Sequence, residues 1–174
     1  MPDALAATLR TVPDFPKPGI SFKDITPLLA DPALFREAVE QLRLPFAGAG
    51  VTHVVGVEAR GFWFGAALAE RLEAGFVPAR KPGKLPAATL RERYALEYGT
   101  DALEIHADAL RPGHRVLLHD DVIATGGTAA AAARLVGRTG AEVAGFSFLV
   151  ELAFLGGRSR LPGDVPFRAV LRVG

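Results

Sequence analysis

The most informative stretch of this sequence is Val116-Leu117-Leu118-His119-Asp120-Asp121-Val122-Ile123-Ala124-Thr125-Gly126-Gly127-Thr128. It begins with apolar residues that predict a buried strand over residues 115–118. Two adjacent carboxylates follow, and a Thr-Gly-Gly-Thr turn then leads into an alanine-rich segment. That segment predicts a helix ending near Gly137, because alanine has the highest helix propensity. A strand, a loop and a helix in this order form the repeating unit of α/β proteins.

The loop within this stretch has the composition of a phosphate-binding site. Adjacent glycines let backbone N–H groups converge, a helix N-terminus adds partial positive charge, and Thr125 and Thr128 offer hydroxyl donors. Asp120 and Asp121 suit the hydroxyl groups of a sugar, or a Mg²⁺ ion held mostly through substrate oxygens and water. Each part alone has an ordinary explanation, a solvated strand end for the acids and a helix-capping turn for the glycines. Their ordered combination behind a buried strand favours a phosphorylated ribose as the ligand.

The rest of the chain alternates between strands and helices. Asp31-Pro32 supplies an N-cap and a proline at the first helical position, which predicts a helix to about Leu44. Two Pro/Gly-rich segments, 12–27 and 80–86, are predicted as loops. The other predicted elements are strands at 51–57, 76–79, 142–152 and 167–173, helices at 4–9 and 62–72, and a hairpin at 94–99 and 102–106. This order predicts an α/β fold with a mainly parallel sheet, helices on both faces, and ligands at the carboxyl ends of the strands.

The composition is that of an ordinary globular protein. The chain has 174 residues, 49% hydrophobic and 22% charged, with 20 Lys and Arg against 19 Asp and Glu. This length suits a single domain over residues 1–174, and a net charge of +1 gives no domain-wide basic field for nucleic acid. The absence of cysteine excludes disulfides and thiolate catalysis. With no signal-peptide pattern and no apolar run of about 20 residues, we expect a cytoplasmic protein that binds neither nucleic acid nor membrane.

Four segments of the sequence resemble a known enzyme family. Residues 116–128 are similar to the signature that binds 5-phosphoribosyl 1-diphosphate in type I phosphoribosyltransferases. Three further segments resemble the adenine phosphoribosyltransferase branch of that family, namely Phe15-Pro16-Lys17-Pro18-Gly19-Ile20 with Phe22-Lys23-Asp24-Ile25-Thr26-Pro27, Gly56-Val57-Glu58-Ala59-Arg60-Gly61-Phe62, and Lys81-Pro82-Gly83-Lys84-Leu85-Pro86 with Tyr94-Ala95-Leu96-Glu97-Tyr98-Gly99. The resemblance covers nearly the whole chain. It implies the type I phosphoribosyltransferase fold, with a small N-terminal hood built from the Pro-rich loop.

The resemblance also implies a reaction and its partners. Adenine and 5-phosphoribosyl 1-diphosphate would give AMP and diphosphate, which is a step of purine salvage. Mg²⁺ would be bound mainly through the substrate diphosphate and water, with no metal ligated directly by the protein. A homodimer is implied as well, and Trp63 and Phe64 would suit either its interface or the core.

The family signature assigns the phosphoribosyl and diphosphate contacts. Asp120 and Asp121 would hold the ribose hydroxyls, and Arg60, Lys81 and Lys84 would stabilise the diphosphate, because forked and point cations bind its oxygens. From residue types alone, Arg60 could cap a helix and the lysines could form a solvated surface. The segment from 80 to about 99 is expected to be a mobile lid. The 5′-phosphate would bind to the loop Ala124, Thr125, Gly126, Gly127 and Thr128.

The resemblance places the purine base at the hood. Adenine would stack on Phe22, with Val122 on its other side and with its edge read by the backbone from Ser21 to Lys23. Glu97 would help to move the proton on a ring nitrogen of the purine. A lone glutamate beside two tyrosines is otherwise a strand-edge residue facing water.

Other functions fit the sequence less well. A guanine- or xanthine-type transferase would read a 6-oxo purine, and the Phe-Pro-Lys-Pro-Gly and Leu-Glu-Tyr-Gly segments argue against it. A regulator that only senses the phosphoribosyl ligand would need a DNA-binding module or a basic face. The four histidines lie at no zinc-ligand spacing, and neither Gly-x-Ser-x-Gly nor Gly-x-Gly-x-x-Gly occurs. His119 stands where the resembled family has an apolar residue.

Overall fold

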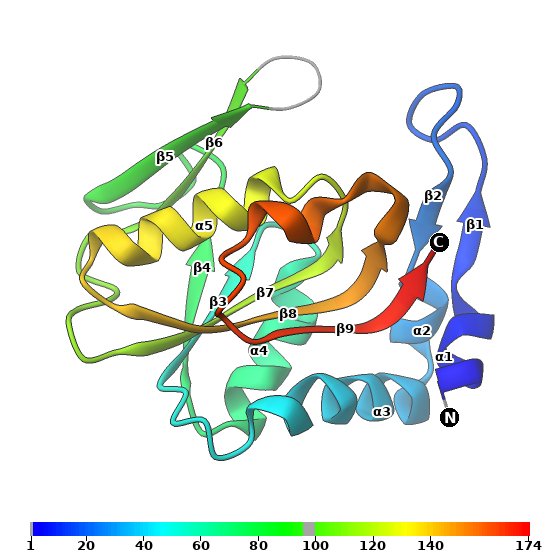
Figure 1. Cartoon of the computed structure of the whole chain (residues 1–174), viewed down its shortest axis with the longest axis horizontal. Helices are drawn as coiled ribbons and strands as arrows, with labels where there is room; N and C mark the ends of the chain where they lie inside the picture. Colours follow the sequence, from blue (N-terminus) through cyan, green and yellow to red (C-terminus); the bar gives the residue numbers. More distant parts are fainter. Residues whose placement is uncertain (1, 96–99) are drawn as a thin grey trace.

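A five-stranded parallel sheet forms the centre of the computed structural model, which describes residues 2–95 and 100–174 (Figure 1). The strands lie in the order β4-β3-β7-β8-β9, and each neighbouring pair is parallel. The prediction of a parallel sheet is confirmed, and the last two strands have the predicted bounds. Their bounds are β4 Gly75–Ala79, β3 His53–Val57, β7 Arg115–Ile123, β8 Glu142–Leu152 and β9 Phe167–Val173.

Helices cover both faces of this sheet, as predicted. On one face α5 (Gly127–Arg138) packs its alanines, Leu135 and Val136 against alternate strand residues such as Val116 and Leu118. On the other face α3 (Pro32–Arg43) and α4 (Gly61–Arg71) pack against the intervening residues, including Leu117. Because successive strand side chains point to opposite faces, one strand contributes to two cores. Short helical segments complete the fold at α1 Pro2–Thr8, α2 Thr26–Ala30, η1 Leu44–Phe46, η2 Ala153–Leu155 and η3 Gly157–Arg160.

The predicted start of α3 is confirmed. The Asp31 side chain accepts hydrogen bonds from the backbone N–H groups of Ala33 (2.8 Å) and Leu34 (3.0 Å), and Pro32 occupies the first helical position. Ala38, Val39 and Leu42 then follow on the buried face of the helix. Local capping and a 3.6-residue period are sufficient to define this element.

Two antiparallel hairpins extend the fold beyond the sheet. Figure 1 shows β5 and β6 above α5, and β1 and β2 at the opposite end of the molecule. The first of these hairpins pairs β5 (Thr89–Ala95) with β6 (Thr100–His106), which confirms a hairpin here. Its first strand begins earlier than predicted, at Thr89, and residues 96–99 of the predicted strand lie outside the described residues. The second pairs β1 (Arg10–Val12) with β2 (Phe22–Asp24), so the predicted 12–27 loop contains a strand and leads into α2. This β1–β2 hairpin is the hood that the family resemblance implied.

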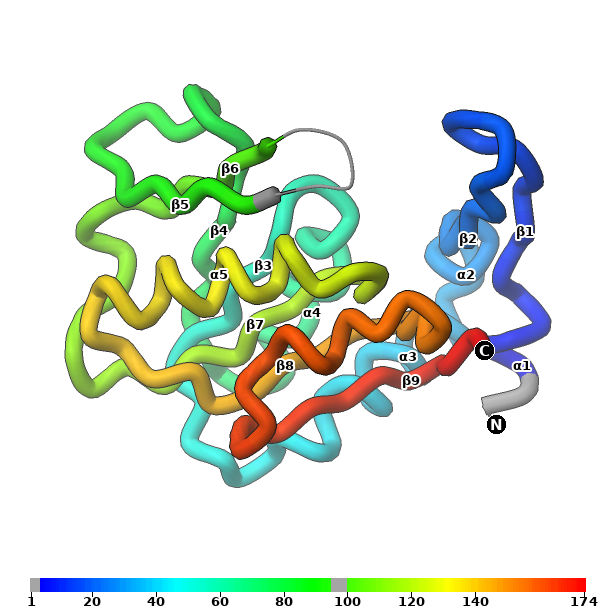
Figure 2. The backbone as a smooth tube through the Cα atoms, turned by 45° about the horizontal axis from the view of Figure 1, so that its top comes forward, coloured from blue at the N-terminus to red at the C-terminus, as the bar shows by residue number. Residues whose placement is uncertain are grey.

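The central strand β7 is longer than the sequence predicted. It was expected to end at Leu118, but it continues to Ile123 and pairs with β8 through Val122 and Ile123. Asp120 and Asp121 therefore lie inside the strand rather than in the loop after it. The smooth tube in Figure 2 shows β7 between β3 and β8 as it approaches the first turn of α5. In the part of the chain that the structure describes, none of the helices is long and apolar enough to cross a membrane.

Candidate active site at the carboxyl ends of the strands

A small cavity lies where β7 passes into α5. It has a volume of about 90 Å³, and its lining consists of Asp120, Phe148 and the run 122–129. The structure thus brings together every residue that was predicted to bind the 5′-phosphate, at the N-terminus of a 12-residue helix. Backbone N–H groups at such a helix end, together with threonine hydroxyls, suit a phosphate group.

The predicted phosphate-binding loop of residues 124–128, called the cradle below, depends on two glycines in close contact. Gly126 has φ +79°, and a Cβ atom added there would lie 2.2 Å from the carbonyl oxygen of Gly157. A Cβ at Gly157 would in turn lie 2.2 Å from the carbonyl oxygen of Ala124. The positive φ falls at Gly126 and not at Gly127, which is the first residue of α5. Of the two adjacent glycines, Gly126 is therefore the one whose substitution would strain the backbone, and Gly157 adds a second requirement that the sequence did not predict.

The two acids occupy a largely buried position beside this cradle. Asp121 is 2% exposed, its carboxylate lies 3.0 Å from Nε of Arg60, and its backbone N–H donates to Oδ1 of Asp120 at 2.9 Å. Burial raises the pKa of Asp120 well above its usual value, and the neighbouring Asp121 charge raises it further. Burial also raises the pKa of Asp121, although the Arg60 guanidinium opposes that shift. Carboxylates in such a place gain from hydroxyl donors supplied by a ligand.

Arg60 connects the acids to the hood. It precedes α4, and Gly61 beside it packs so closely on β7 that an added Cβ would lie 3.0 Å from Oδ1 of Asp120. The guanidinium carbon of Arg60 lies 4.8 Å from the centre of the Phe22 ring, and its Nη1 is buried with no hydrogen-bond partner among the described residues. A buried donor without a partner is costly unless a ligand oxygen accepts from it. This arrangement fits an anionic substrate.

A second, mostly apolar pocket lies under the hood. Its volume is about 360 Å³, and its lining consists of Val12, Phe15, Phe22, Asp24, Ile25, Thr26 and Arg60. Phe15 and Phe22 meet edge to face with ring centres 5.1 Å apart. Of the predicted adenine contacts, Phe22 lines this pocket, whereas Ser21 and Lys23 do not, and the Lys23 ammonium donates to Oγ1 of Thr11 at 2.8 Å. Val122 lines the phosphate cavity instead.

The predicted diphosphate lysines both engage carboxylates of the protein. Lys81 Nζ donates to the hydroxyl of Tyr94 at 2.9 Å and to the Asp101 carboxylate, and Lys84 Nζ donates to Oε1 of Glu58 at 2.5 Å. Sequence reasoning assigned no role to Glu58 or Asp101. Segment 80–86 contains no helix or strand, as predicted, and its two lysines are paired with carboxylates although Lys84 stays half exposed.

The two remaining predictions concern Glu97 and the aromatic pair Trp63 and Phe64. Glu97 lies outside the described residues. The helix after Arg60 separates its two aromatic residues, because Phe64 is fully buried in the core while Trp63 is 44% exposed.

Comparison with known proteins gives consistent matches. Residues 24–162 match the model of a family described as phosphoribosyl transferase domain. Adenine phosphoribosyltransferase of Synechococcus sp. (strain JA-3-3Ab) is 62% identical over 168 residues, which cover 96% of each chain. The crystal structure of adenine phosphoribosyltransferase from Rhodothermus marinus superimposes with a TM-score of 0.96 at 59% identity, covering 99% of this chain and 98% of that one. The Saccharomyces cerevisiae enzyme, complexed with adenine and an imino-altritol bisphosphate, gives 0.92 at 41% identity, with 98% of each chain covered.

Proposed function

The chain belongs to the adenine phosphoribosyltransferase branch of the phosphoribosyl transferase family, and from this we propose how its residues form AMP and diphosphate from adenine and 5-phosphoribosyl 1-diphosphate. The observation that carries the proposal is the convergence of the cradle, the two acids of β7 and Arg60 at one edge of the sheet. These groups match the phosphate, the ribose and the diphosphate of a single substrate.

The 5′-phosphate binds in the cavity formed by residues 124–128. Asp120 and Asp121 accept hydrogen bonds from the ribose hydroxyls, which add donors to the backbone and Arg60 contacts that these carboxylates already have. Arg60 places its unpartnered Nη1 on the diphosphate, joined by Lys81 and Lys84. The support for this assignment is the shared location of these groups at the carboxyl ends of β3 and β7, where parallel sheets bind ligands.

Adenine binds in the pocket under the hood against the ring of Phe22. The Arg60 guanidinium covers that ring in the present structure, so it leaves this position as the base enters and the diphosphate attracts it. Backbone groups from Ser21 to Lys23 read the edge of the base, and Val122 approaches from β7. Glu97 helps to remove the proton from the reacting purine.

The chemical step places positive charge on the ribose ring. The bond from C1 of ribose to the diphosphate breaks as a purine nitrogen attacks that carbon, and the electron pair leaves with the diphosphate. Cations fixed near the leaving group stabilise its growing negative charge, while the buried acids stabilise the positive ring. Once the substrates are bound and Arg60 has reached the diphosphate, these charges need little further reorganisation as the bond breaks.

Mg²⁺ supplies further positive charge to the diphosphate when it is bound. Among the described residues, no three carboxylate or imidazole side chains converge as a ready-made metal site. We propose that the ion would take its ligands mainly from diphosphate oxygens and water, beside the carboxylates of Asp120 and Asp121.

We extend the proposal to the protein's assembly and location. The chain acts as one domain and forms a homodimer, for which the exposed Trp63 on α4 offers an apolar contact. It acts in the cytoplasm, where its phosphorylated substrate is available. Neither nucleic acid nor a membrane takes part.

A turnover assay with four bases tests the function. Purified protein is mixed with 5-phosphoribosyl 1-diphosphate, Mg²⁺ and either adenine, guanine, hypoxanthine or xanthine, and nucleotides are separated by chromatography. We expect AMP from adenine and no product from the 6-oxo purines. Comparable turnover of a 6-oxo purine would overturn the base assignment. Calorimetric binding of 5-phosphoribosyl 1-diphosphate without turnover of any base would favour a ligand-sensing regulator instead.

A further inference from the structure

One buried carboxylate accepts hydrogen bonds from three residues of the basic segment 80–84. Glu58 follows β3 directly, and its side chain is only 9% exposed. Its two oxygens accept from Arg80 Nε at 3.3 Å and Nη2 at 3.5 Å, from Lys84 Nζ at 2.5 Å, and from the backbone N–H of Lys81 at 2.8 Å. Donors from three residues therefore meet at one acceptor, two residues before Arg60 in the sequence.

A second buried carboxylate holds the same segment from the other side. Glu104 lies on β6 and is 3% exposed. It accepts from the backbone N–H of Gly83 at 3.0 Å and from Arg91 Nε at 2.7 Å, while its own backbone exchanges two 2.8 Å hydrogen bonds with Arg80. Two of the backbone N–H groups of segment 80–84, those of Lys81 and Gly83, are thus bound to buried carboxylates.

The surroundings of Glu58 favour the ionised form of its carboxyl group. Burial opposes its ionisation, but the hydrogen bonds from Lys84, Lys81 and Arg80 outweigh burial and lower the pKa of Glu58 to about 2. The carboxylate is consequently charged throughout the physiological range. Removing its charge would leave the surrounding cations free to repel one another and would release the backbone of Lys81.

The donors around Glu58 differ in how easily a ligand can take them. The backbone N–H of Lys81 cannot leave without moving the chain, and the Arg80 side chain is two-thirds covered. Lys84 is half exposed, so its ammonium can turn from Glu58 to an external anion while Arg80 and the backbone N–H of Lys81 keep Glu58 paired. The segment therefore has a fixed part and an exchangeable cation.

We propose that Glu58 is a positioning residue for diphosphate binding, which holds segment 80–84 in a fixed place before substrate arrives and passes Lys84 to the diphosphate. The proposal rests on the proposed function, because it takes Lys81 and Lys84 as diphosphate ligands. A lid that is mobile from residue 80 onward was expected from the sequence. The proposal instead has segment 80–84 held in place by Glu58 and Glu104 before substrate binds. Pre-positioned cations lose less entropy on binding than cations on a free loop.

The test combines amide exchange with steady-state kinetics. Hydrogen–deuterium exchange is measured on unliganded protein over residues 78–86, for the wild type, Glu58→Gln, Glu58→Asp and Arg80→Met. The matched control is Glu142→Gln, which neutralises an exposed carboxylate paired with Arg115 at the opposite end of β7. Melting temperatures identify any variant that fails to fold. Arg80→Met alters Glu58's surroundings from a partly exposed side chain, so it remains informative if Glu58→Gln does not fold.

Slow exchange at Lys81 and Gly83 in the unliganded wild type is the first expected result. In Glu58→Gln, exchange at Lys81 should rise at least 10-fold, and KM for 5-phosphoribosyl 1-diphosphate should rise about 10-fold while kcat changes less than 3-fold. KM for adenine should stay unchanged. Arg80→Met should shift exchange and KM in the same direction, Glu58→Asp should recover part of both, and Glu142→Gln should match the wild type.

Fast exchange at Lys81 in the wild type would overturn the proposal, because the segment would then be a free lid. Unchanged exchange or unchanged KM in folded Glu58→Gln would overturn it too. These failures differ from failure of the proposed function, in which the wild type itself makes no AMP. The exchange measurements need no turnover, so they report on the Glu58 anchor in either case.

Discussion

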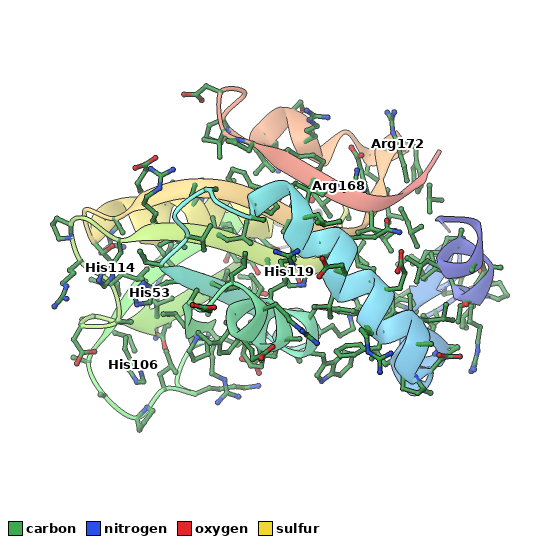
Figure 3. The ribbon with its side chains drawn as sticks, turned by 90° about the horizontal axis from the view of Figure 1, so that it is seen from below. His53, His106, His114, His119, Arg168 and Arg172 are labelled. Carbon is green, nitrogen blue, oxygen red and sulfur yellow. The ribbon has the colours of Figure 1, made fainter. Side chains whose placement is uncertain are left out.

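His119 should make the stability of this protein fall as the pH falls below neutrality. Its side chain lies between the sheet and α4, where Figure 3 shows it in the interior of the molecule. It is 1% exposed, Nδ1 lies 3.4 Å from Oγ of Ser147, and Nε2 has no hydrogen-bond partner among the described residues. Burial lowers the pKa of His119 to about 3, and the hydrogen bond with Ser147 opposes this only weakly.

The sign and size of the effect follow from these values. The unfolded chain protonates a histidine near pH 6.5, whereas the folded protein keeps His119 neutral to about pH 3. Between these values the unfolded state binds one more proton, so the free energy of unfolding decreases by about 1.4 kcal/mol for each pH unit lost. At pH 5 the chain is about 1.5 pH units below the unfolded pKa, and the loss from His119 is about 2 kcal/mol.

A difference measurement isolates this contribution. The raised pKa values of Asp120 and Asp121 act in the opposite direction, and the lowered pKa of His53 acts in the same direction. Each of these groups is present in both the wild type and His119→Leu, so its effect largely cancels when the two proteins are compared. Leucine removes the titrating group and keeps an apolar side chain against Phe64.

Urea unfolding followed by far-ultraviolet circular dichroism at pH 7.5 and pH 5.0 is the assay, at one fixed protein concentration. The stability of the wild type relative to His119→Leu should fall by about 2 kcal/mol between the two pH values. Phe64→Leu, a core substitution beside His119 that titrates nothing, should change stability by the same amount at both. Equal pH dependence of the wild type and His119→Leu would show that the folded protein protonates His119 freely, which would refute the reasoning from burial.

Three further predictions test the site and the assembly. Asp121→Asn should lower kcat/KM at least 100-fold in steady-state assays, because it removes a charged acceptor at the ribose site. Near-normal activity of this variant would show that Asp121 does not bind the ribose. Gly126→Ala should lower the free energy of unfolding by at least about 2 kcal/mol and weaken calorimetric binding of 5-phosphoribosyl 1-diphosphate, whereas Gly137→Ala, where the added Cβ meets nothing within 4 Å, should stabilise α5 by up to about 1 kcal/mol. Trp63→Glu should convert a dimer to a monomer in light scattering, and a wild-type monomer would exclude this interface.

Elements with strong local signals were predicted almost residue for residue. The start of α3 is defined by Asp31 and Pro32, and β8 and β9 are mainly apolar segments with few charged residues. The predicted end of β7 was wrong for a physical reason. Aspartate is rare within strands, so Asp120 and Asp121 indicated a strand end. The strand continues because Val122 and Ile123 pair with β8. Arg60, about 60 residues earlier in the chain, pairs with Asp121, and no local pattern contains that partner.

The two glycines of the cradle show where sequence reasoning stops. Gly126 could be foreseen as part of an anion-binding turn, since adjacent glycines permit a left-handed backbone. Gly157 stands in an unremarkable Gly-Gly-Arg segment, yet its lack of a side chain is equally necessary, because a Cβ there would meet the carbonyl oxygen of Ala124 at 2.2 Å. The requirement at Gly157 arises only when η3 packs against the turn before α5. A phosphate cradle is therefore specified partly by its own motif and partly by a distant glycine whose role appears only in three dimensions.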